Sequence, residues 1–492
     1  MRIQGVLFLA VINLMLSTCF CAQPETQYLA IFIDGQKCGY AVHNRAVLEQ
    51  TVRTTERVML TITRFGVPVT MGTVETSIET IKGEPLGFEA IQDMSMWRTT
   101  ISGTVSSDGK VSATSVTGQF KQEKNFDWPK GGLMAEGLRL LEKSCGLAEG
   151  TEYSARVFSP SMLQAVDTKV TIGAKKPVDL LGQTVTLTEV TSRTNMFLSG
   201  EVKSTSYVDD ELRAMKTQMM MMGMRLEMAA CSKEFALSEN APADFVNKTF
   251  VTSPRPLTDI DSATAARYRI RPKDNANDLK IPSNDNQKVK STAGGKVLVV
   301  VRPVPVPNRA RFGYRGNDAE ILEALKPNQF VQSDDENIQR LAREAVGETD
   351  NAAEAAKRIE SFVANYIDDT TLSVGYASAA EVADSREGDC TEFAVLTAAL
   401  CRAAGIPARI VVGVAYVDEF MEFENVFGGH AWTEVYLNGK WYGLDSAFKA
   451  SGRGGYDAGH IALAAGSGNL EGYFSLLFNI GQFEIEEVDI QK

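Results

Sequence analysis

The sequence predicts a multidomain protein in which an antiparallel, β-rich N-terminal domain precedes an α+β C-terminal domain. Three observations support this fold class. Thr- and Val-rich runs with hairpin turn signals occupy the first half, helices with capping signals begin after residue 316, and short strands follow them. At roughly 150 residues per domain, a chain of 492 residues has room for about three folded units.

The composition excludes several classes of protein. Aromatic residues make up 8% of the chain and charges of both signs are mixed, which excludes a mainly disordered protein, and 40 Gly with 16 Pro exclude a collagen-like one. The formal net charge of -12 argues against a nucleic-acid partner, because neutralising phosphates requires a basic face. No local cluster of Lys and Arg provides such a face.

Residues 1–21 have the pattern of a secretory signal peptide. Arg2 is the only charge before Glu25, the stretch 6–20 is almost entirely apolar, and small residues precede the expected cleavage after residue 21. Two alternatives stay open, an uncleaved membrane anchor and a lipoprotein signal with its lipid on Cys19. The segment is short for an anchor, since a span needs about 20 apolar residues. The residues before Cys19 fit a lipoprotein signal poorly. We therefore expect an exported protein located in the periplasm, in the cell envelope or outside the cell.

Cleavage would leave five cysteines, namely Cys38, Cys145, Cys231, Cys390 and Cys401. An odd and sparse set in a chain of this size is not a disulfide scaffold. At least one thiol therefore stays free, and a free thiol in an oxidising compartment is a candidate for a chemical role.

We expect residues 22–240 to form the β-rich N-terminal domain. The run Tyr28–Ile33 leads into Asp34-Gly35, a dipeptide that favours the positive φ angles of a tight hairpin. One amphipathic segment, Leu133–Lys143, predicts a helix, and no catalytic constellation is visible in this domain. The range Met215–Met228 is rich in methionine, which suggests either a thioether copper site or an adaptable apolar strand. We favour the strand, because no histidine lies nearby.

Residues 241–315 are predicted to be a linker with short strands. The polar run Pro272–Asp278 cannot bury a core, whereas Arg267–Arg271 and Lys296–Arg302 resemble strands.

Residues 316–492 combine helices and strands. Ser333 and Ser378 each begin a capping-box pattern, and Asp350 is expected to open another helix. Strands are predicted at three places, namely Ala408–Val417, His430–Leu437 and Lys440–Ser446. Between the first two we expect a loop, Asp418–Phe427, that is either a mobile acidic wall or an ordinary solvated loop.

A buried helix begins at Cys390. Asp389 can cap it and Glu392, three residues later, completes a capping box, while Gly405-Ile406-Pro407 ends it. The free backbone N–H groups and the helix dipole at this end favour an anionic sulfur and can hold an oxyanion. An ordinary buried cysteine is the competing interpretation, and Cys401 in the same helix fits it.

A hairpin decides between these interpretations. Asn438-Gly439 is a strong two-residue turn, and the register that it sets places His430 as a diagonal neighbour of Asp445, with Cα atoms roughly 7 Å apart. A carboxylate in that place can orient an imidazole that pairs with a thiolate. The chain has 3 His in all, and one of them falls here.

The motifs Gly388–Glu392, Cys401–Arg409, His430–Val435 and Trp441–Asp445 together resemble the core of the transglutaminase-like superfamily, and its exported bacterial members most. The resemblance covers residues 316–465. It implies a papain-like α+β catalytic domain at 316–492, with a Cys-His-Asp triad on Cys390, His430 and Asp445. The aspartate is followed by Ser446-Ala447-Phe448, where many members have Pro-Thr, and the calcium sites of animal transglutaminases find no match.

The resemblance implies a cysteine-dependent amide hydrolase or acyltransferase acting on protein or peptide substrates through a thioester. Hydrolysis is slightly favoured over transfer to an amine, because water is always present. The alternative is a non-catalytic exported binding or scaffold protein that uses its β-rich domain for recognition. No cofactor and no metal are expected. Asp457 and His460 could join His430 around a metal, but a structural histidine is the favoured interpretation. The sequence leaves the substrate, the second oxyanion donor and the oligomeric state open.

Overall fold

The computed structural model describes most of the chain after the predicted signal peptide. The described residues are 24–64, 67–94, 97–118, 120–196, 200–221, 223–241, 249–273, 281–370, 377–468 and 480–492. The predictions for residues 1–21, including the lipid anchor considered at Cys19, fall outside them. Among the described residues, no helix has both the length and the apolar character needed to span a membrane.

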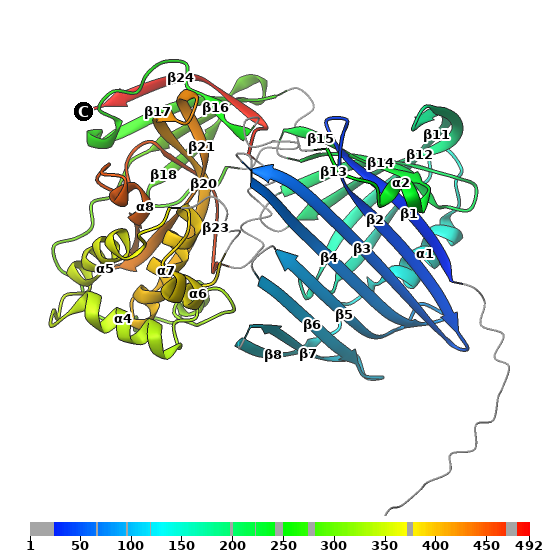
Figure 1. Ribbon diagram of the computed structural model, residues 1–492, viewed down its shortest axis with the longest axis horizontal. Coiled ribbons are helices and arrows are strands. Elements are labelled where there is room, and N and C mark those ends of the chain that lie inside the picture. Colours follow the sequence, from blue (N-terminus) through cyan, green and yellow to red (C-terminus); the bar gives the residue numbers. More distant parts are fainter. Residues whose placement is uncertain are drawn as a thin grey trace, which may run out of the picture.

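The N-terminal part is built on one sheet of fifteen strands, as expected from its Thr- and Val-rich runs (Figure 1). The sheet order is β8-β7-β6-β5-β4-β3-β2-β1-β15-β14-β13-β12-β11-β10-β9. Its strands are β1 (Glu25–Ile33), β2 (Gln36–Leu48), β3 (Thr51–Arg64), β4 (Val67–Thr80), β5 (Pro85–Met94), β6 (Trp97–Val105), β7 (Lys110–Thr117), β8 (Phe120–Asp127), β9 (Gly132–Leu133), β10 (Glu152–Ser159), β11 (Gln164–Leu180), β12 (Gln183–Met196), β13 (Gly200–Val208), β14 (Ala214–Met221) and β15 (Met224–Cys231).

Hairpin turns and alternation of side chains explain this sheet. Neighbouring strands along each half pair antiparallel, and only β9 and β10 pair in parallel. Asp34 and Gly35 take φ angles of 47° and 82° between β1 and β2, as the hairpin signal predicts. In β7 the buried residues alternate with exposed ones, so that one face of the sheet forms a core around Phe88 and Phe158.

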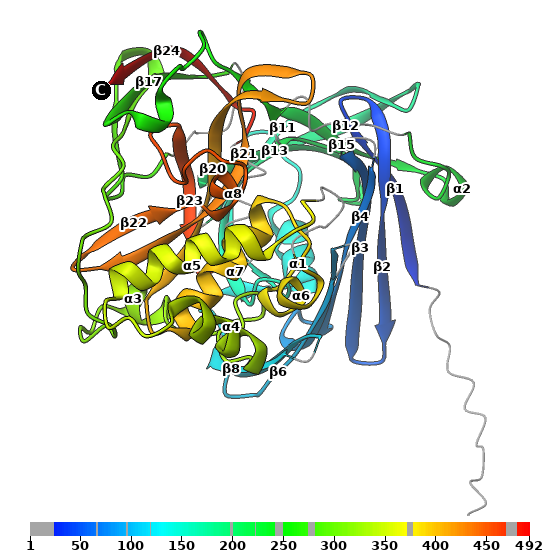
Figure 2. The ribbon, with the colours of Figure 1, turned by 60° about the vertical axis from the view of Figure 1, so that its left-hand side comes forward.

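Two helices belong to this part, α1 (Ala135–Cys145) and α2 (Lys233–Ala236). Helix α1 confirms the helix expected near 133–143, and it contacts β3 and β4 as well as β9 and β10. Because these strands come from opposite arms of the sheet, the sheet curves around α1 (Figure 2). The methionine-rich range forms β14 and β15, in which Met224 is buried and Met219 and Met228 pack against a core.

The segment predicted as a linker with short strands takes part in a sheet of its own. Its strands are β16 (Val251–Thr252), β17 (Ala265–Pro272), β18 (Gln287–Ser291) and β19 (Val297–Val301), with 3-10 turns at Ile260–Ser262 and Ala293–Gly295. Strands β18, β19 and β17 line up with the late strand β24 (Phe483–Gln491) in a four-stranded sheet. β17 and β19 were expected, whereas β18 was not, because Gln287–Ser291 carries only one apolar residue.

The C-terminal part is built on a five-stranded sheet, with most of its helices on one face. The helices are α3 (Ala319–Glu323), α4 (Glu336–Val346), α5 (Ala352–Tyr366), α6 (Ala379–Ser385), α7 (Cys390–Ala403) and α8 (Ser446–Ala450). The strands are β20 (Ala408–Phe420), β21 (Phe423–Leu437), β22 (Lys440–Leu444) and β23 (His460–Gly466). The order is β16-β21-β20-β23, with β22 paired to β21. Helix α7 packs on β20 and β21 and, with α4, α5 and α6, encloses one apolar core.

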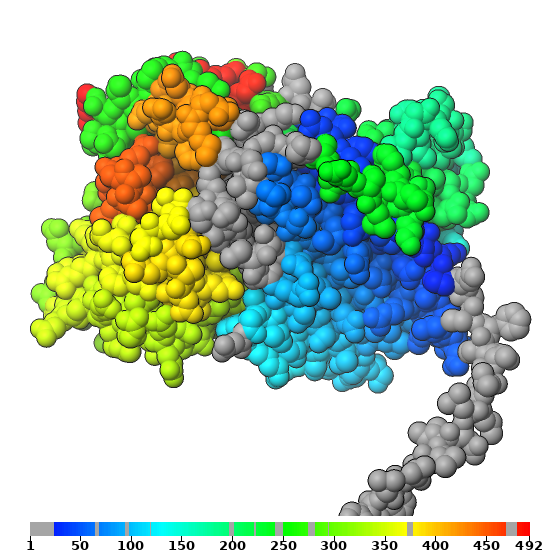
Figure 3. Space-filling model, viewed as in Figure 1, coloured from blue at the N-terminus to red at the C-terminus, as the bar shows by residue number. Residues whose placement is uncertain are grey.

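A second core connects all parts of the chain. It gathers Ile31 and Leu226 from the N-terminal sheet, Tyr268 from β17, Tyr416 from β20 and Phe483 from β24. The N-terminal and C-terminal parts lie side by side in the space-filling view (Figure 3), and Ser115 of β7 also donates a hydrogen bond to Gln329, at 3.4 Å. The parts are therefore packed together through buried side chains as well as through the chain connection.

Four local expectations for the C-terminal part were wrong. Helix α5 is capped by Asn351 and not by Asp350, because the Asn351 side chain accepts from the N–H of Ala353, at 3.1 Å. Helix α4 is capped by Asp335 and not by Ser333, because the Asp335 carboxylate accepts from the N–H groups of Asn337 and Ile338. The expected loop Asp418–Phe427 is mostly a hairpin, in which β20 and β21 pair as far as Phe420 and Phe423.

The strand expected at Lys440–Ser446 ends at Leu444. Asp445 caps α8 instead, since its side chain accepts from the N–H of Phe448, at 3.0 Å.

Candidate active site

The first turn of α7 is fixed by the predicted capping box. The Asp389 carboxylate accepts from the N–H of Thr391, at 2.8 Å, and the Glu392 carboxylate accepts from the N–H of Asp389, at 2.8 Å. The other oxygen of Glu392 accepts from the N–H of Ala377, at 2.7 Å. Burial, followed by repulsion from Asp389, raises the pKa of Glu392 well above its usual value. This network sets where the helix begins, and Cys390 is its first residue.

Gly388 is required just before this turn. It has a φ of +158°, and a Cβ atom built there would lie 2.2 Å from the Cβ of Glu392. Any side chain at this position would therefore push Glu392 out of the capping box.

The five described cysteines are all free thiols, and their surroundings differ. Burial raises the pKa of Cys38 to about 11 and raises the pKa of Cys401, which is completely buried, still further. Cys390 is only partly buried and lies at a helix start, where free N–H groups favour an anion.

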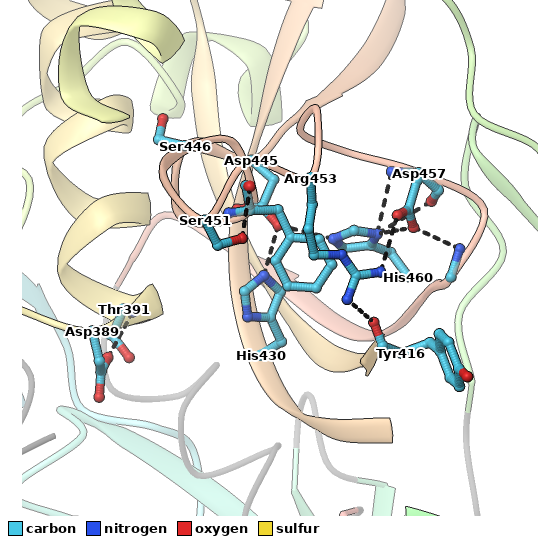
Figure 4. Close-up of polar contacts among 12 residues, drawn as sticks. Asp389, Thr391, Tyr416, His430, Asp445, Ser446, Ser451, Arg453, Asp457 and His460 are labelled. Atoms are coloured by element: carbon cyan, nitrogen blue, oxygen red, sulfur yellow. Dashed lines mark hydrogen bonds and ion pairs between the residues drawn. The ribbon is translucent and has the colours of Figure 1, made fainter. Parts of the chain in front are cut away.

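His430 and Asp445 meet as the hairpin register predicts. β21 and β22 pair Leu437 with Lys440 and keep that register as far as Thr433 and Leu444. The Nε2 atom of His430 lies 2.7 Å from Oδ2 of Asp445, in a buried position (Figure 4). With Nε2 turned toward the carboxylate, Nδ1 is the ring nitrogen that remains for another partner.

Cys390 is one of the groups that act on His430. Burial lowers the pKa of His430, but the charge and hydrogen bond of Asp445, together with the interaction with Cys390, outweigh it and raise the pKa to about 9. Burial likewise raises the pKa of Asp445, but His430 and His460 outweigh this effect, so that the pKa falls well below the ordinary carboxyl range. The structure thus brings Cys390, His430 and Asp445 into one cluster.

Hydrogen bonds between elements hold the cluster together. Thr433 of β21 donates to the carbonyl of Ala394 in α7, at 2.9 Å, and Thr397 of α7 lies 2.7 Å from the hydroxyl of Ser446 in α8. The backbone N–H of Asp445 donates to the buried Glu360 of α5, at 2.9 Å. The helix that carries the thiol is therefore tied to the strand that carries the histidine and to the turn that carries the aspartate.

A second histidine reaches the same carboxylate. The Nε2 atom of His460, at the start of β23, lies 2.9 Å from Oδ2 of Asp445, and its Nδ1 lies 2.9 Å from Oδ1 of Asp457 (Figure 4). Sequence reasoning placed His460 near the sheet but not on Asp445. β23 pairs with β20, from which the whole β21–β22 hairpin separates it in the sequence, so no turn fixes its register in advance.

His430, Asp445 and His460 also form the cluster best suited to a metal ion among the described residues, with one atom from each within 4.8 Å of the others. Both histidine Nε2 atoms, however, already lie at hydrogen-bond distance from the same carboxylate oxygen. A metal would have to displace both bonds. Asp457 contacts His460 and not His430 among the described contacts. The three residues considered from the sequence as metal ligands, His430, Asp457 and His460, therefore do not form one ligand group.

Arg409 and Glu434 form an ion pair at 2.7 Å, and the Arg409 guanidinium lies over the Trp441 ring. The two residues therefore form a structural pair across β20 and β21.

Residues 339–446 match the family model described as the transglutaminase-like superfamily. These residues form a transglutaminase-like core. The core includes Cys390, His430 and Asp445, whereas His460 lies just beyond it. A search of curated proteins finds no match to the chain.

Solved structures that resemble parts of the chain do so distantly. A candidate cysteine protease from Cytophaga hutchinsonii is 18% identical, covers 46% of this chain and 86% of its own, and gives a TM-score of 0.29. The periplasmic domain of TgpA from Pseudomonas aeruginosa, bound to ethylmercury, is 16% identical, with 42% and 92% covered and a TM-score of 0.28. A β-barrel-like protein from Brucella abortus is 13% identical, with 42% and 96% covered and a TM-score of 0.33.

Proposed function

We propose that the protein is an exported, transglutaminase-like thiol enzyme that acts on peptide or glutamine amides. In this proposal Cys390 is the nucleophile, His430 the general acid and base, and Asp445 the residue that orients His430. The supporting observation is the chain of interactions that runs from Cys390, at the start of α7, through the buried His430 to the buried Asp445. We also propose that α7, packed on β20 and β21, forms the papain-like arrangement of a catalytic domain at 316–492.

The first half of the reaction would form a thioester. The Cys390 sulfur, as thiolate, attacks the amide carbonyl carbon, and the carbonyl π electrons move to oxygen. Backbone N–H groups at the start of α7, including that of Cys390, can hold this oxyanion. When the oxyanion collapses, the C–N bond breaks and the proton on Nδ1 of His430 passes to the leaving amine or ammonia.

The second half would release the acyl group. His430 takes a proton from water or from a primary amine as that nucleophile attacks the thioester carbon. The C–S bond then breaks, which gives an acid in the first case and a new amide in the second. We propose that hydrolysis is slightly favoured, because water needs no binding site of its own.

Asp445 would set the orientation of His430 throughout. Its Oδ2 fixes the Nε2–H of the imidazole, so that Nδ1 faces the thiol. The low pKa of Asp445 keeps the carboxylate charged at any physiological pH, and this charge stabilises the imidazolium that forms in each half-reaction.

We further propose that residues 22–240, a β-rich domain, recognise or place the protein or peptide substrate, while 241–315 connect the two functional parts. The observation in favour is the extent of the fifteen-stranded sheet, in which no described group of His, Cys, Asp and Glu has metal-ligand geometry. Export through residues 1–21, and association with the cell envelope, belong to the same proposal.

A single assay with three readouts tests the function. The mature chain is incubated with a glutamine-containing peptide, with and without a primary amine, and the products are separated by mass spectrometry. Glutamate in place of glutamine or a cleaved peptide would show hydrolysis, and an added amine would show transfer. Cys390→Ser should abolish every product, whereas Cys145→Ser is the matched control and should not.

Activity that survives Cys390→Ser would overturn the proposal. A wild-type chain that binds peptides through residues 22–240 but forms none of these products would favour the alternative, a non-catalytic binding or scaffold protein.

A further inference from the structure

His460 has no part in the triad, yet it is as deeply buried as any ionisable group of the site. It is fully buried, and both of its ring nitrogens face carboxylate oxygens, those of Asp445 and Asp457 (Figure 4). From this arrangement we propose that His460 is a positioning residue, an imidazolium that stays protonated at neutral pH, holds Asp445 in place and limits how basic His430 becomes. The inference rests on the proposed function, because it concerns the control of the same triad.

Hydrogen-bond geometry requires two protons on the His460 ring. Its Nε2 lies 2.9 Å from Oδ2 of Asp445, and its Nδ1 lies 2.9 Å from Oδ1 of Asp457. Two acceptors do not approach this closely without a proton between them. The backbone N–H of Asp457, which a neutral ring could accept, is farther away, at 3.3 Å.

The histidine ring is the group that we take to carry the proton. The Asp457 oxygen that faces it also accepts from the backbone N–H of Gly459, at 2.7 Å, and the guanidinium of Arg453 lies 3.8 Å from the second oxygen. Burial lowers the pKa of His460, but Asp457 and Asp445 outweigh it and raise the pKa to about 9.

The charged and titratable surroundings of His460 come from several elements. β21 contributes His430, with its ring centroid 5.5 Å away, and the segment before β23 contributes Tyr456, at 4.8 Å. The remaining groups do not contact His460 directly. Glu360, which pairs with Lys449, accepts from the backbone N–H of Asp445, and Arg453 lies near Asp457. Glu434 acts on Tyr456, and the hydroxyl of Tyr268 donates to the carbonyl of Ala458. Among these described groups, His460 is the one cation in direct contact with Asp445 apart from His430.

This placement has two consequences for the triad. Asp445 is held by three donors, His430, His460 and the backbone N–H of Phe448, which leaves its carboxylate one orientation. In addition, the positive charge of His460 offsets part of the negative charge that His430 experiences from Asp445. Without His460 the pKa of His430 would rise, so His430 would give up its proton to the leaving group less readily.

The chain offers a direct test, because it contains only 3 His, at positions 43, 430 and 460. Protein labelled with ¹⁵N in its histidine rings should give three sets of ring signals. His43→Gln and His460→Gln each remove one set and thereby assign all three. His43 lies on β2 in the N-terminal sheet, so His43→Gln is the matched control for the same chemical change outside the site.

In the wild-type protein the His460 signals should show both nitrogens protonated at pH 7 and remain so above pH 8. In His460→Gln the titration midpoint of His430 should rise by about one pH unit, and His43→Gln should leave it unchanged. The alkaline limb of the activity profile should move in the same direction.

Two results would overturn the inference. One is a neutral His460 tautomer at pH 7 in the wild-type protein, a measurement that needs no variant to fold. The other is a folded His460→Gln protein with an unchanged His430 midpoint, which would mean that His460 only packs the interior. Both readouts are independent of turnover. A chain without enzymatic activity would therefore defeat the proposed function and still allow a decision on His460.

Discussion

Asp445 is the residue on which the polar groups of the site converge. It accepts from two imidazoles and one backbone N–H through its side chain, and its own N–H donates to Glu360. A buried carboxylate that lost any of these partners would be left partly unpaired, at a cost of about 1–3 kcal/mol for each lost bond. The site is therefore stabilised by hydrogen bonds between buried charged groups and not by apolar packing alone.

The thiols should differ sharply in reactivity. We expect iodoacetamide at neutral pH to modify Cys390 first and to remove activity, since burial raises the pKa of Cys38 to about 11 and that of Cys401 still higher. Asp445→Asn should slow both the labelling and the turnover while the fold persists. Peptide mapping by mass spectrometry gives the order of labelling. Faster modification of another cysteine in folded protein would contradict the assignment of Cys390 as nucleophile.

The two buried histidines should make stability depend on pH. The pKa of each is about 9 in the folded protein, against an ordinary value of 6.5. Each therefore stabilises the fold fully below about pH 6.5, and this contribution, roughly 3 kcal/mol per histidine, is lost as the pH rises through about 9. The pKa of Asp445 is lowered, so its contribution is lost only as the pH falls below its ordinary value of 3.8.

Calorimetry from pH 5 to pH 10 should thus show a melting temperature that falls between about pH 7 and pH 9. His43→Gln should keep most of this decline, whereas His460→Gln should reduce it. A melting temperature that stays level across this range in the wild-type protein would contradict the high pKa values of His430 and His460.

At the scale of elements, the turn into α7 is the most constrained piece of backbone at the site. We expect Gly388→Ala to destabilise the protein by more than about 2 kcal/mol and to reduce turnover strongly, because the added Cβ collides with Glu392 and breaks the capping box. Gly405→Ala, at the other end of the same helix, is the control. It has a φ of +77° and nothing within 4 Å of the added atom, so it should cost only about 1 kcal/mol. Urea denaturation of both variants measures the difference, and equal losses would show that the collision is relieved.

Local signals predicted the elements that carry the site. Asn438-Gly439 fixed the register of β21 and β22, and with it the meeting of His430 and Asp445. The capping box of Asp389 and Glu392 fixed where α7 begins, and with it the position of Cys390 on the first turn. His460 could not be placed in this way, because the register of β23 on β20 depends on side chains that meet only in the folded protein. The end of β22 was misjudged since Asp445 serves as a helix cap, a role that the alternation of strand residues does not reveal.

At the scale of the whole molecule, the core that joins the N-terminal sheet to β17, β20 and β24 decides how independent the parts are. The β-rich character of residues 22–240 could be read from composition and turns. The meeting of β1 with β15 and the pairing of β17 with β24 could not, because both join segments about two hundred residues apart. The polar residues between β17 and β18 led to the prediction of a linker. The strands on either side of them, however, belong to the four-stranded sheet.

Residues 22–240 expressed alone should keep strand-rich circular dichroism and melt cooperatively, as expected of a domain with its own core around Phe88. The fragment should melt at a lower temperature than the full chain and bind an apolar dye, because Ile31, Ile33 and Leu226 lose their partners in the shared core. A disordered fragment would mean that the parts fold only together. A fragment as stable as the full chain would mean that the shared core contributes little.

Trp432 gives the molecule an optical indicator of its own. Its ring lies 6.1 Å from His430, stacked, and 5.2 Å from His460, edge-on, and the chain has only 4 Trp. An imidazolium quenches the emission of a neighbouring indole by accepting an electron from its excited state, whereas neutral imidazole does so weakly. The fluorescence of Trp432 should therefore brighten as these rings lose their protons, and a stopped-flow trace could follow the charge on the histidines during a single turnover without any added dye.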